Sequence, residues 1–340
     1  MTTAAALPLR ALAPAKINLG LFVGAVREHD GQHELASVMQ SISLADTLTL
    51  EWADDARRHE AGAGEGPNTS KDEGEGEGRG TRAGVDEVVC PGVPGAPAEN
   101  LAAAALRVFR EATDWEAPAL RLTIDKRIPV AAGLGGGSAD AAAALRLAAR
   151  ASGLDSEELL LELAVRLGAD VPAQVAPGRW LASGAGERLR ELPAPSHPFG
   201  VLVLALAAEL STAAVYARAD ELREPRGERE LAEKLRAIEV AFELSAAVPQ
   251  EHELLHNDLQ EAAISLCPQV RPTLTQALEA GADVAFVSGS GPTVVGLFAR
   301  ANGSGRAERA AAGLAGEREA AGEPAPVCAT PVDVDFARAE

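Results

Sequence analysis

Cysteine and lysine are scarce in this chain of 340 residues. The three cysteines, Cys90, Cys267 and Cys328, lie far apart. That spacing excludes a disulfide framework and a zinc knuckle made of paired cysteines. Lysine occurs only at Lys16, Lys71, Lys126 and Lys234. Each lysine can therefore be considered individually as a functional candidate.

Long apolar runs are absent as well. No stretch approaches the ~18 apolar residues of a membrane-spanning helix, which argues against a membrane protein. The segment from Met1 to Arg10 lacks a basic region, an apolar stretch and a cleavage site, so we expect no secretory signal. Together with the cysteine usage, these absences favour the cytoplasm.

Basic residues are outnumbered by acidic ones, 31 against 50, which gives a net charge of −19. This balance argues against a nucleic-acid-binding protein, because a nucleic acid requires a basic face. A small phosphorylated ligand is still compatible, since a few local donors suffice for it. Hydrophobic residues make up 47% of the chain, which excludes a wholly disordered protein. The length favours two domains.

The hydrophobic pattern predicts a mixture of strands and helices that does not alternate regularly. We expect strands at 15–26, 41–51, 120–124, 201–207, 284–288, 294–298 and 332–336. We expect helices at 99–111, 138–151, 156–167, 228–242, 256–266, 269–280 and 306–319. This order indicates a two-layer α+β fold rather than a doubly wound sheet. Residues 61–84 are almost entirely polar or glycine, so we interpret about 53–86 as a disordered acidic insertion.

A Gly-rich segment leads into the helix predicted at 138–151. It reads Pro129-Val-Ala-Ala-Gly-Leu-Gly-Gly-Gly-Ser-Ala-Asp140. Glycines let backbone N–H groups approach a ligand, and a helix N-terminus adds free donors and a positive dipole end. The spacing fits neither a dinucleotide fingerprint nor a Walker A loop, and the protein-kinase signatures are absent. We predict a polyphosphate site; the alternative is a tight turn with Ser138 as helix N-cap.

Two charged residues lie in apolar surroundings. Lys16 interrupts the first predicted strand, so its ammonium group is either paired at a cleft or extends from an edge strand to water. Asp170 lies between apolar neighbours just after a predicted helix, and it is either a general base or an N-cap. The residues alone do not decide between these alternatives.

Two further segments have competing interpretations. The segment 288–293 forms a hairpin turn or borders the phosphate site. His29 and His33 are four residues apart, which suits zinc only in a helix, whereas Asp30 and Gly31 indicate a turn. For His33 we therefore also consider contact with a polar ligand.

Taken together, these residues resemble the GHMP kinase superfamily and, within it, the family of 4-diphosphocytidyl-2-C-methyl-D-erythritol kinases. The Gly-rich loop marks the superfamily. Residues 14–19 with 30–35, which contain Lys-Ile-Asn-Leu and Gly-x-His-Glu-Leu, point to the narrower family. The resemblance covers most of the chain outside 53–86. Further matching stretches are 46–48, 99–101, 168–172, 210–212, 257–259 and 288–293.

The resemblance implies a two-domain GHMP kinase fold with the active site in the cleft between the domains. It implies an ATP-binding N-terminal half that resembles ribosomal protein S5 domain 2 and, after it, a ferredoxin-like C-terminal half. We place the boundary between residues 1–175 and 176–340.

The implied activity is transfer of the γ-phosphoryl group of ATP, with Mg²⁺, to the tertiary 2-hydroxyl of 4-diphosphocytidyl-2-C-methyl-D-erythritol. This is a step of the non-mevalonate route to isoprenoids. Lys16 and Asp170 match the catalytic lysine and the catalytic base. Asn18 and Thr212 match substrate-side residues, His33 the reader of the cytosine edge, and Tyr216 the aromatic that stacks on cytosine.

The ATP side of the site also follows from the resemblance. The phosphate loop is Pro129, Val130, Ala131, Ala132, Gly133, Leu134, Gly135, Gly136, Gly137, Ser138 and Ala139, and Asn100 borders the nucleotide. Ser138 is the expected hydroxyl contact to phosphate or Mg²⁺. The partners would be small molecules only, with no nucleic acid and no membrane, and either a monomer or a dimer is compatible.

One departure from the family pattern concerns the residues that would contact the cytosine ring. Gln32 stands where the family usually has Tyr or Phe before the histidine.

Two alternative functions are also compatible with the sequence: another GHMP small-molecule kinase, of homoserine or mevalonate type, and a non-catalytic nucleotide-binding paralogue.

Overall fold

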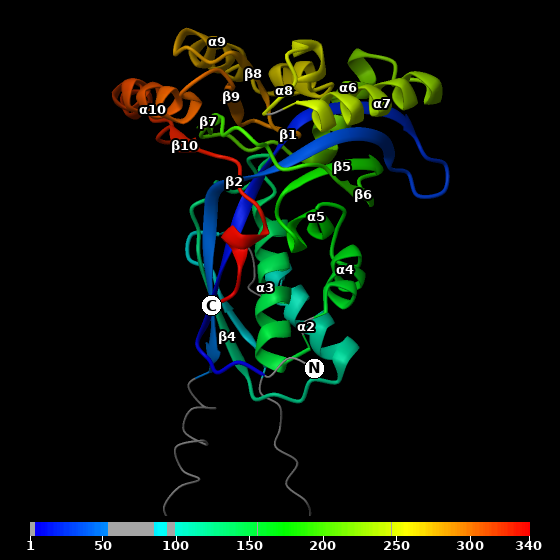
Figure 1. Ribbon diagram of the computed structural model, residues 1–340, viewed down its shortest axis with the longest axis vertical. Coiled ribbons are helices and arrows are strands. Elements are labelled where there is room, and N and C mark those ends of the chain that lie inside the picture. The colour runs from blue at the N-terminus through cyan, green and yellow to red at the C-terminus, as the bar shows by residue number, and fades with distance from the viewer. Residues whose placement is uncertain (1–3, 54–84, 94–98, 155, 246) are drawn as a thin grey trace, which may run out of the picture.

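The computed structural model describes residues 4–53, 85–93, 99–154, 156–245 and 247–340. Apart from its ends, the acidic insertion predicted at 53–86 lies outside the described residues. Two sheets with their helices form the lower and upper parts of an elongated molecule (Figure 1). None of the described helices is long and apolar enough to cross a membrane.

The first sheet is built around two long antiparallel strands, β1 (Leu9–Val26) and β2 (His33–Trp52). Shorter strands pair along β2: β4 (Leu120–Asp125) with its end and β5 (Arg179–Gly184) with its beginning. The edges are β3 (Glu87–Val89), parallel to β4, and β6 (Arg188–Glu191), antiparallel to β5. β1 and β2 extend from the lower part of the molecule into the upper part (Figure 1).

Four helices pack with this sheet: α2 (Leu101–Thr113), α3 (Gly136–Ser152), α4 (Glu157–Val165) and α5 (Val171–Val175). The buried face of α3 is mostly alanine, which lets its backbone lie close to α2 and to β1. Ser156, the first residue of the helix predicted at 156–167, is the N-cap of α4, and its hydroxyl accepts the N–H of Leu159.

The second sheet has the order β10-β7-β9-β8, and all its pairs are antiparallel. Its strands are β7 (Gly200–Leu204), β8 (Val284–Val287), β9 (Val294–Phe298) and β10 (Val327–Ala329). The helices of this half are α6 (Thr212–Leu222), α7 (Glu228–Leu244), α8 (Gln260–Leu266), α9 (Val270–Glu279) and α10 (Gly303–Ala320).

One apolar cluster joins the two halves. It contains Ile17 and Leu19 of β1, Val201 of β7, Val295 of β9 and Phe242 of α7, all buried. Burying such side chains contributes about 1.5–3 kcal/mol each. The interface between the halves is therefore a hydrophobic core, and the observed architecture is the predicted two-domain α+β fold.

The strand predicted at 332–336 is wrong. The closing strand is β10, and Val334–Ala337 forms a 3-10 turn because the Asp333 side chain accepts the N–H of Asp335. The patterns also missed β3, β5, β6, α5, α6 and β10. The domain boundary at 175 stays a prediction; in the structure the first sheet continues to Glu191.

Candidate active site

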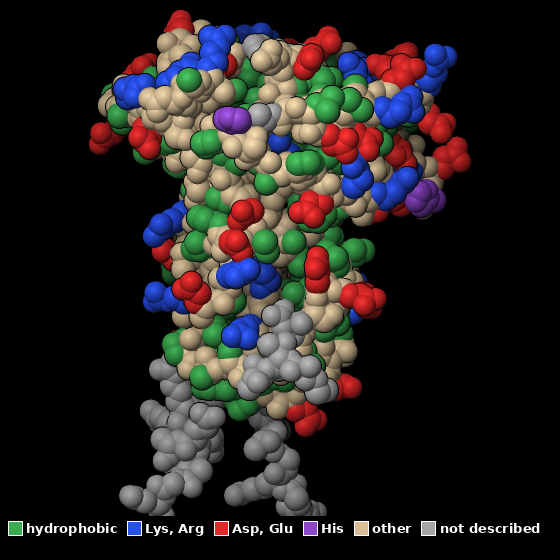
Figure 2. Space-filling model, viewed as in Figure 1, with side chains coloured by type: hydrophobic (Ala, Val, Ile, Leu, Met, Phe, Trp, Pro, Cys, Tyr) green, Lys and Arg blue, Asp and Glu red, His purple; other side chains and the backbone are tan. Residues whose placement is uncertain are grey.

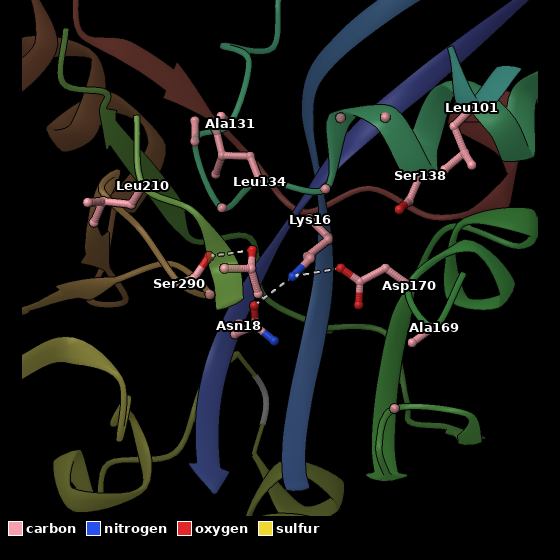
Figure 3. Close-up of a pocket in the computed structure, with 18 of the residues that line it drawn as sticks. Lys16, Asn18, Leu101, Ala131, Leu134, Ser138, Ala169, Asp170, Leu210 and Ser290 are labelled. Atoms are coloured by element: carbon pink, nitrogen blue, oxygen red, sulfur yellow. Dashed lines mark hydrogen bonds and ion pairs between the residues drawn. The ribbon is translucent and has the colours of Figure 1, made fainter. Parts of the chain in front are cut away.

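A cavity of about 1170 Å³ lies where β1, β2, the Gly-rich loop and α6 meet. It brings together all of the predicted site residues except Ala139, which is buried in α3. Lys16, Asn18, Ser138 and Asp170 point toward its centre (Figure 3). The lining residues among those predicted are Lys16, Asn18, His33, Asn100, 129–138, Asp170, Thr212 and Tyr216.

The Gly-rich loop delivers an uncapped helix N-terminus to this cavity. α3 begins at Gly136, and Gly135 is the N-cap, in the left-handed region at φ 70 and without a side-chain cap. The alternative that Ser138 is the N-cap is therefore wrong, because Ser138 lies inside the first turn. The first N–H groups of α3 lack partners within the helix, so they are available to an anion.

Gly133 explains why the loop needs glycine. Its φ is +75, and a Cβ there would lie 2.2 Å from the carbonyl oxygen of Ser288. The loop thus packs directly on the turn between β8 and β9. Gly137 differs, because a Cβ there would meet nothing within 4 Å. The open side of Gly137 leaves room for a ligand at the helix end.

Lys16 and Asp170 form an ion pair in the cavity wall. Lys16 Nζ lies 3.3 Å from Asp170 Oδ2, with side chains 9% and 41% exposed. Register shifts in β1 flank Lys16, and such bulges re-aim side chains. Asp170 stands at the N-cap position of α5 but makes no side-chain cap hydrogen bond. Lys16 therefore does not extend to bulk water, and the Asp170 carboxylate is not used as a cap.

A hydrogen-bond chain orients the lysine. Lys16 Nζ donates to Asn18 Oδ1 at 2.8 Å, and Asn18 Nδ2 donates to Ser37 Oγ at 2.8 Å. Ser37 in turn donates to the carbonyl of Gly20 at 2.7 Å. Residues 16 and 18 share one face of β1 because side chains alternate along a strand. Sequence analysis missed Ser37, because its contact depends on the pairing of β1 with β2.

The opposite end of the cavity is formed by the start of β2 and by α6. The rings of His33 and Tyr216 have centroids 5.1 Å apart and are tilted by 34°. His33 Nδ1 lies 2.9 Å from the carbonyl oxygen of Gly24, and Nε2 lies 3.3 Å from Asp220 Oδ2. Burial, and then the charge of Asp170, raise the pKa of Tyr216 to about 12. Tyr216 is therefore a neutral phenol.

The segment 288–293 is both a hairpin turn and part of the cavity. Asn257 Nδ2 donates to the carbonyls of Val287 and Gly289, each at 2.7 Å. Ser290 Oγ lies 3.1 Å from Thr212 Oγ1, which links the turn to α6 (Figure 3). The segment is thus a hairpin turn that lines the cavity, and its place beside a phosphate site stays a prediction.

A buried charge cluster below the loop was not predicted. Lys126 Nζ lies 2.5 Å from Asp46 Oδ2 and 2.8 Å from Asp140 Oδ2. Asp46 Oδ1 accepts the N–H groups of Arg127 and Ile128, directly before the loop. Burial raises the pKa of Asp140 to about 7, although Lys126 opposes this shift. The scarcity of lysine and the position of Lys126 before the loop were the signals that could have indicated it.

The side chains around the cavity limit which metal ions it could hold. The described residues contain no group of three His, Cys, Asp or Glu side chains that could hold a metal ion. His29 is exposed in the turn before β2, away from any helix, which leaves no basis for the zinc alternative. Ser138 offers a hydroxyl to the cavity from the first turn of α3, and such a group would suit a Mg²⁺ ion held mainly by phosphate oxygens.

Comparison with known proteins identifies the family. The family model "GHMP kinases N terminal domain" matches residues 100–178, and "GHMP kinases C terminal" matches residues 238–317. The chain is 40% identical over 290 residues to 4-diphosphocytidyl-2-C-methyl-D-erythritol kinase of Corynebacterium efficiens, covering 84% of each chain. It is 38% identical over 326 residues to the kinase of the same name from Streptomyces avermitilis, covering 92% of this chain and 96% of the relative.

Solved structures agree with the fold. The crystal structure of a 4-(cytidine 5'-diphospho)-2C-methyl-D-erythritol kinase superposes with a TM-score of 0.65 at 30% identity, covering 95% of this chain and 98% of that one. A homoserine kinase from Cytophaga hutchinsonii has a TM-score of 0.68 at 14% identity, covering 100% and 99%, a likeness of fold alone. The chain belongs to the GHMP kinases, and within them to the 4-diphosphocytidyl-2-C-methyl-D-erythritol kinase family.

Proposed function

We propose that this protein uses ATP to phosphorylate the 2-hydroxyl of 4-diphosphocytidyl-2-C-methyl-D-erythritol, giving the 2-phosphate, in the non-mevalonate isoprenoid pathway. The observation that carries the proposal is the Lys16–Asp170 ion pair, which lies in one cavity with an uncapped helix N-terminus. Its location would be the cytoplasm, its partners small molecules only, and its state a monomer or a dimer.

The chemistry assigns one role to each member of the pair. The Asp170 carboxylate accepts the proton of the 2-hydroxyl as the oxygen forms a bond to the γ-phosphorus of ATP and the bond to ADP breaks. Lys16 has three N–H donors. One bonds Asn18 and one faces Asp170. The third is available to an oxygen of the transferring group, whose charge it stabilises.

The phosphate loop, residues 129–139, would hold the ATP phosphates on the N–H groups at the start of α3. Asn100 already caps α2 by accepting the N–H of Ala102, so its contribution to the nucleotide site is to fix the helix end there. Mg²⁺, when bound with the phosphates, neutralises charge that develops during transfer. Ser138 would hold it through its hydroxyl.

The acceptor would occupy the other end of the cavity. Asn18 and Thr212 would contact the methylerythritol part, while His33 and Tyr216 would contact the base. A base cannot lie between these two rings, because their centroids are 5.1 Å apart and two stacking steps require about 7 Å. Tyr216 would therefore supply the stacking face, and His33 would read the edge of the base. Stacking contributes about 1–3 kcal/mol per base.

Product analysis tests the proposal. Purified protein is incubated with ATP, Mg²⁺ and the cytidine substrate, beside homoserine and mevalonate, and the products are identified by mass. We expect phosphorylation of the cytidine compound alone. Phosphorylation of homoserine or mevalonate alone would instead support another GHMP kinase activity. Bound ATP without any product would support a non-catalytic nucleotide-binding protein.

A further inference from the structure

Arg146 lies in the middle of α3, and its guanidinium group bonds two other elements of the first half of the chain. Nη1 donates to the carbonyl oxygens of Gln174 at 2.6 Å and Val175 at 3.3 Å, both in α5. Nη2 donates to the carbonyl oxygen of Leu12 in β1 at 2.8 Å. Burial lowers the pKa of Arg146 to about 10, so the group is still charged at neutral pH. One cation thus joins α3, α5 and β1.

The helix α5 depends on contacts from outside, because it consists only of Val171–Val175. So short a helix is not stable by its own hydrogen bonds, and its last carbonyl groups lack partners within the helix. Arg146 supplies donors to two of these carbonyl groups. It therefore fixes the end of α5 that lies opposite Asp170, the N-cap residue.

The contact between Asp170 and Lys16 follows the position of α5. The Asp170 side chain makes no cap hydrogen bond, so nothing at the helix start holds it apart from its ion pair with Lys16. Gln174 of the same helix packs close to the lysine stem. A Cβ on Gly135 would lie 3.0 Å from Lys16 Cγ and 3.5 Å from Gln174 Nε2. A shift of α5 would therefore change the distance between Asp170 and Lys16.

The lysine strand is held from α3 in the same way. Leu12 lies four residues before Lys16, and a register shift of β1 against β2 falls between them, after Pro14. Pairing with β2 is thus interrupted just before the lysine. Arg146 holds β1 before the shift. The Gly-rich loop holds it after the shift, where the N–H of Lys16 donates to the carbonyl of Leu134 at 2.9 Å.

We propose that Arg146 is a positioning residue for phosphoryl transfer, which sets the distance between Lys16 and Asp170 by holding β1 and α5 against α3. This inference rests on the proposed function, because it assumes that these two side chains act on the transferred group. Arg146 does not touch the substrate itself. It lies about 15 Å along α3 from Gly136, and the described residues that line the cavity do not include it.

The test measures kcat and KM for wild type, Arg146→Met and Arg146→Lys. Methionine fills much of the same space but donates no hydrogen bond. A misplacement of about 1 Å can cost about 100-fold in rate, so we expect Arg146→Met to lower kcat about 10–100-fold, with both KM values within about twofold. Lysine has one ammonium group in place of two donor nitrogens, so Arg146→Lys should restore kcat in part. It also carries the test if the methionine variant does not fold.

Arg110→Met is the matched control. Arg110 also bonds three backbone carbonyls from a helix of the same half, and it pairs with Asp86 as well. These carbonyls belong to Trp115, Ala117 and Pro118, none of which lines the cavity. We expect Arg110→Met to lower the Tm in thermal unfolding while kcat stays within about twofold of wild type. The control separates loss of positioning from loss of stability.

A double variant shows whether Arg146 acts through Asp170. In an Asp170→Asn background, Arg146→Met should lower kcat much less than it does in wild type, because the group that it positions is already inactive. Full multiplication of the two losses would overturn the assignment. A kcat of Arg146→Met within threefold of wild type would overturn it as well.

Hydrogen exchange separates failure of this inference from failure of the proposed function. If wild type phosphorylates none of the acceptors, the proposed activity fails. Exchange of backbone amides, followed by mass spectrometry, would then still test the role of Arg146. Arg146→Met should speed exchange in residues 168–175, whereas Arg110→Met should leave that segment unchanged. Equal exchange of 168–175 in Arg146→Met and wild type would refute the inference.

Discussion

Valine at position 137 should abolish tight ATP binding without unfolding the protein. Gly137 lies in the first turn of α3 and lines the cavity, and a Cβ there meets nothing within 4 Å. The isopropyl group of Gly137→Val would occupy the space in front of the uncapped N–H groups. Valine is also a better helix former than glycine, so the fold should not lose stability from this change.

The magnitude follows from the contacts that valine would displace. A hydrogen bond to a charged group contributes about 1.5–3 kcal/mol. Loss of one or two N–H contacts to phosphate is therefore worth about 3 kcal/mol, which corresponds to roughly 100-fold in Kd. Gly133→Ala should behave differently, because a Cβ there would lie 2.2 Å from the carbonyl of Ser288 at a φ of +75. That variant should lose stability as well as affinity.

Calorimetry with a non-hydrolysable ATP analogue measures the Kd, and thermal unfolding measures stability. Gly316→Val is the matched control, since Gly316 is also a helical glycine, in α10, whose Cβ would meet nothing within 4 Å. We expect the control to bind ATP as wild type does. An ATP affinity of Gly137→Val within threefold of wild type would refute the assignment of phosphate binding to the start of α3.

Three further variants test the site and the fold. Asp170→Asn should keep ATP affinity and lower kcat about 10²–10⁴-fold, the range for a positioned base, so single-turnover activity within threefold of wild type would show that another group accepts the proton. Ser37→Ala removes the hydrogen bond that fixes Asn18 and should lower kcat about fivefold, in line with one hydrogen bond of about 1 kcal/mol, with stability checked by urea unfolding. Asp258→Asn should lower the free energy of unfolding by about 3 kcal/mol at neutral pH, because the buried carboxylate accepts charged hydrogen bonds from Arg226, which would then keep only Glu230, and such bonds contribute about 1.5–3 kcal/mol each. Burial raises the pKa of Asp258, but hydrogen bonds from His256, Arg226 and the N–H of Val23 outweigh it and hold the pKa well below the ordinary value. Its contribution is therefore present above a pH of about 4 and is lost as pH falls further, so urea unfolding at several pH values should show a weaker acid dependence in the variant; equal slopes would contradict the argument.

The parts of the site that sequence analysis found are those marked by a local contrast. Lys16 is a charge within an apolar strand, and the four glycines at 133 and 135–137 exceed what a turn requires. Such contrasts are visible without knowledge of the fold. They led to Lys16 in the cavity wall and to the Gly-rich loop, and the structure brings both into one cavity.

The parts that were missed depend on pairing between distant segments. Ser37 meets Asn18 only through the register of β1 and β2, and Asp220 meets His33 only because α6 packs against the start of β2. The short strands β5 and β6 lack a strong pattern of their own, and α6 buries a single residue, Val215. Val334 was misassigned because the alternation around it is made by Asp333 and Asp335, and Asp333 caps a turn.

The two long strands limit how this protein can be divided or opened. β1 lies against α3 in the lower part of the molecule, and its residues Ile17 and Leu19 belong to the core shared with the second sheet. The core of the upper part of the molecule thus includes side chains from the first fifty residues of the chain. In the space-filling view the upper and lower parts form one continuous body (Figure 2). An isolated C-terminal half would expose that core to water and should not fold alone. The same shared core argues against a hinge between the two parts of the molecule.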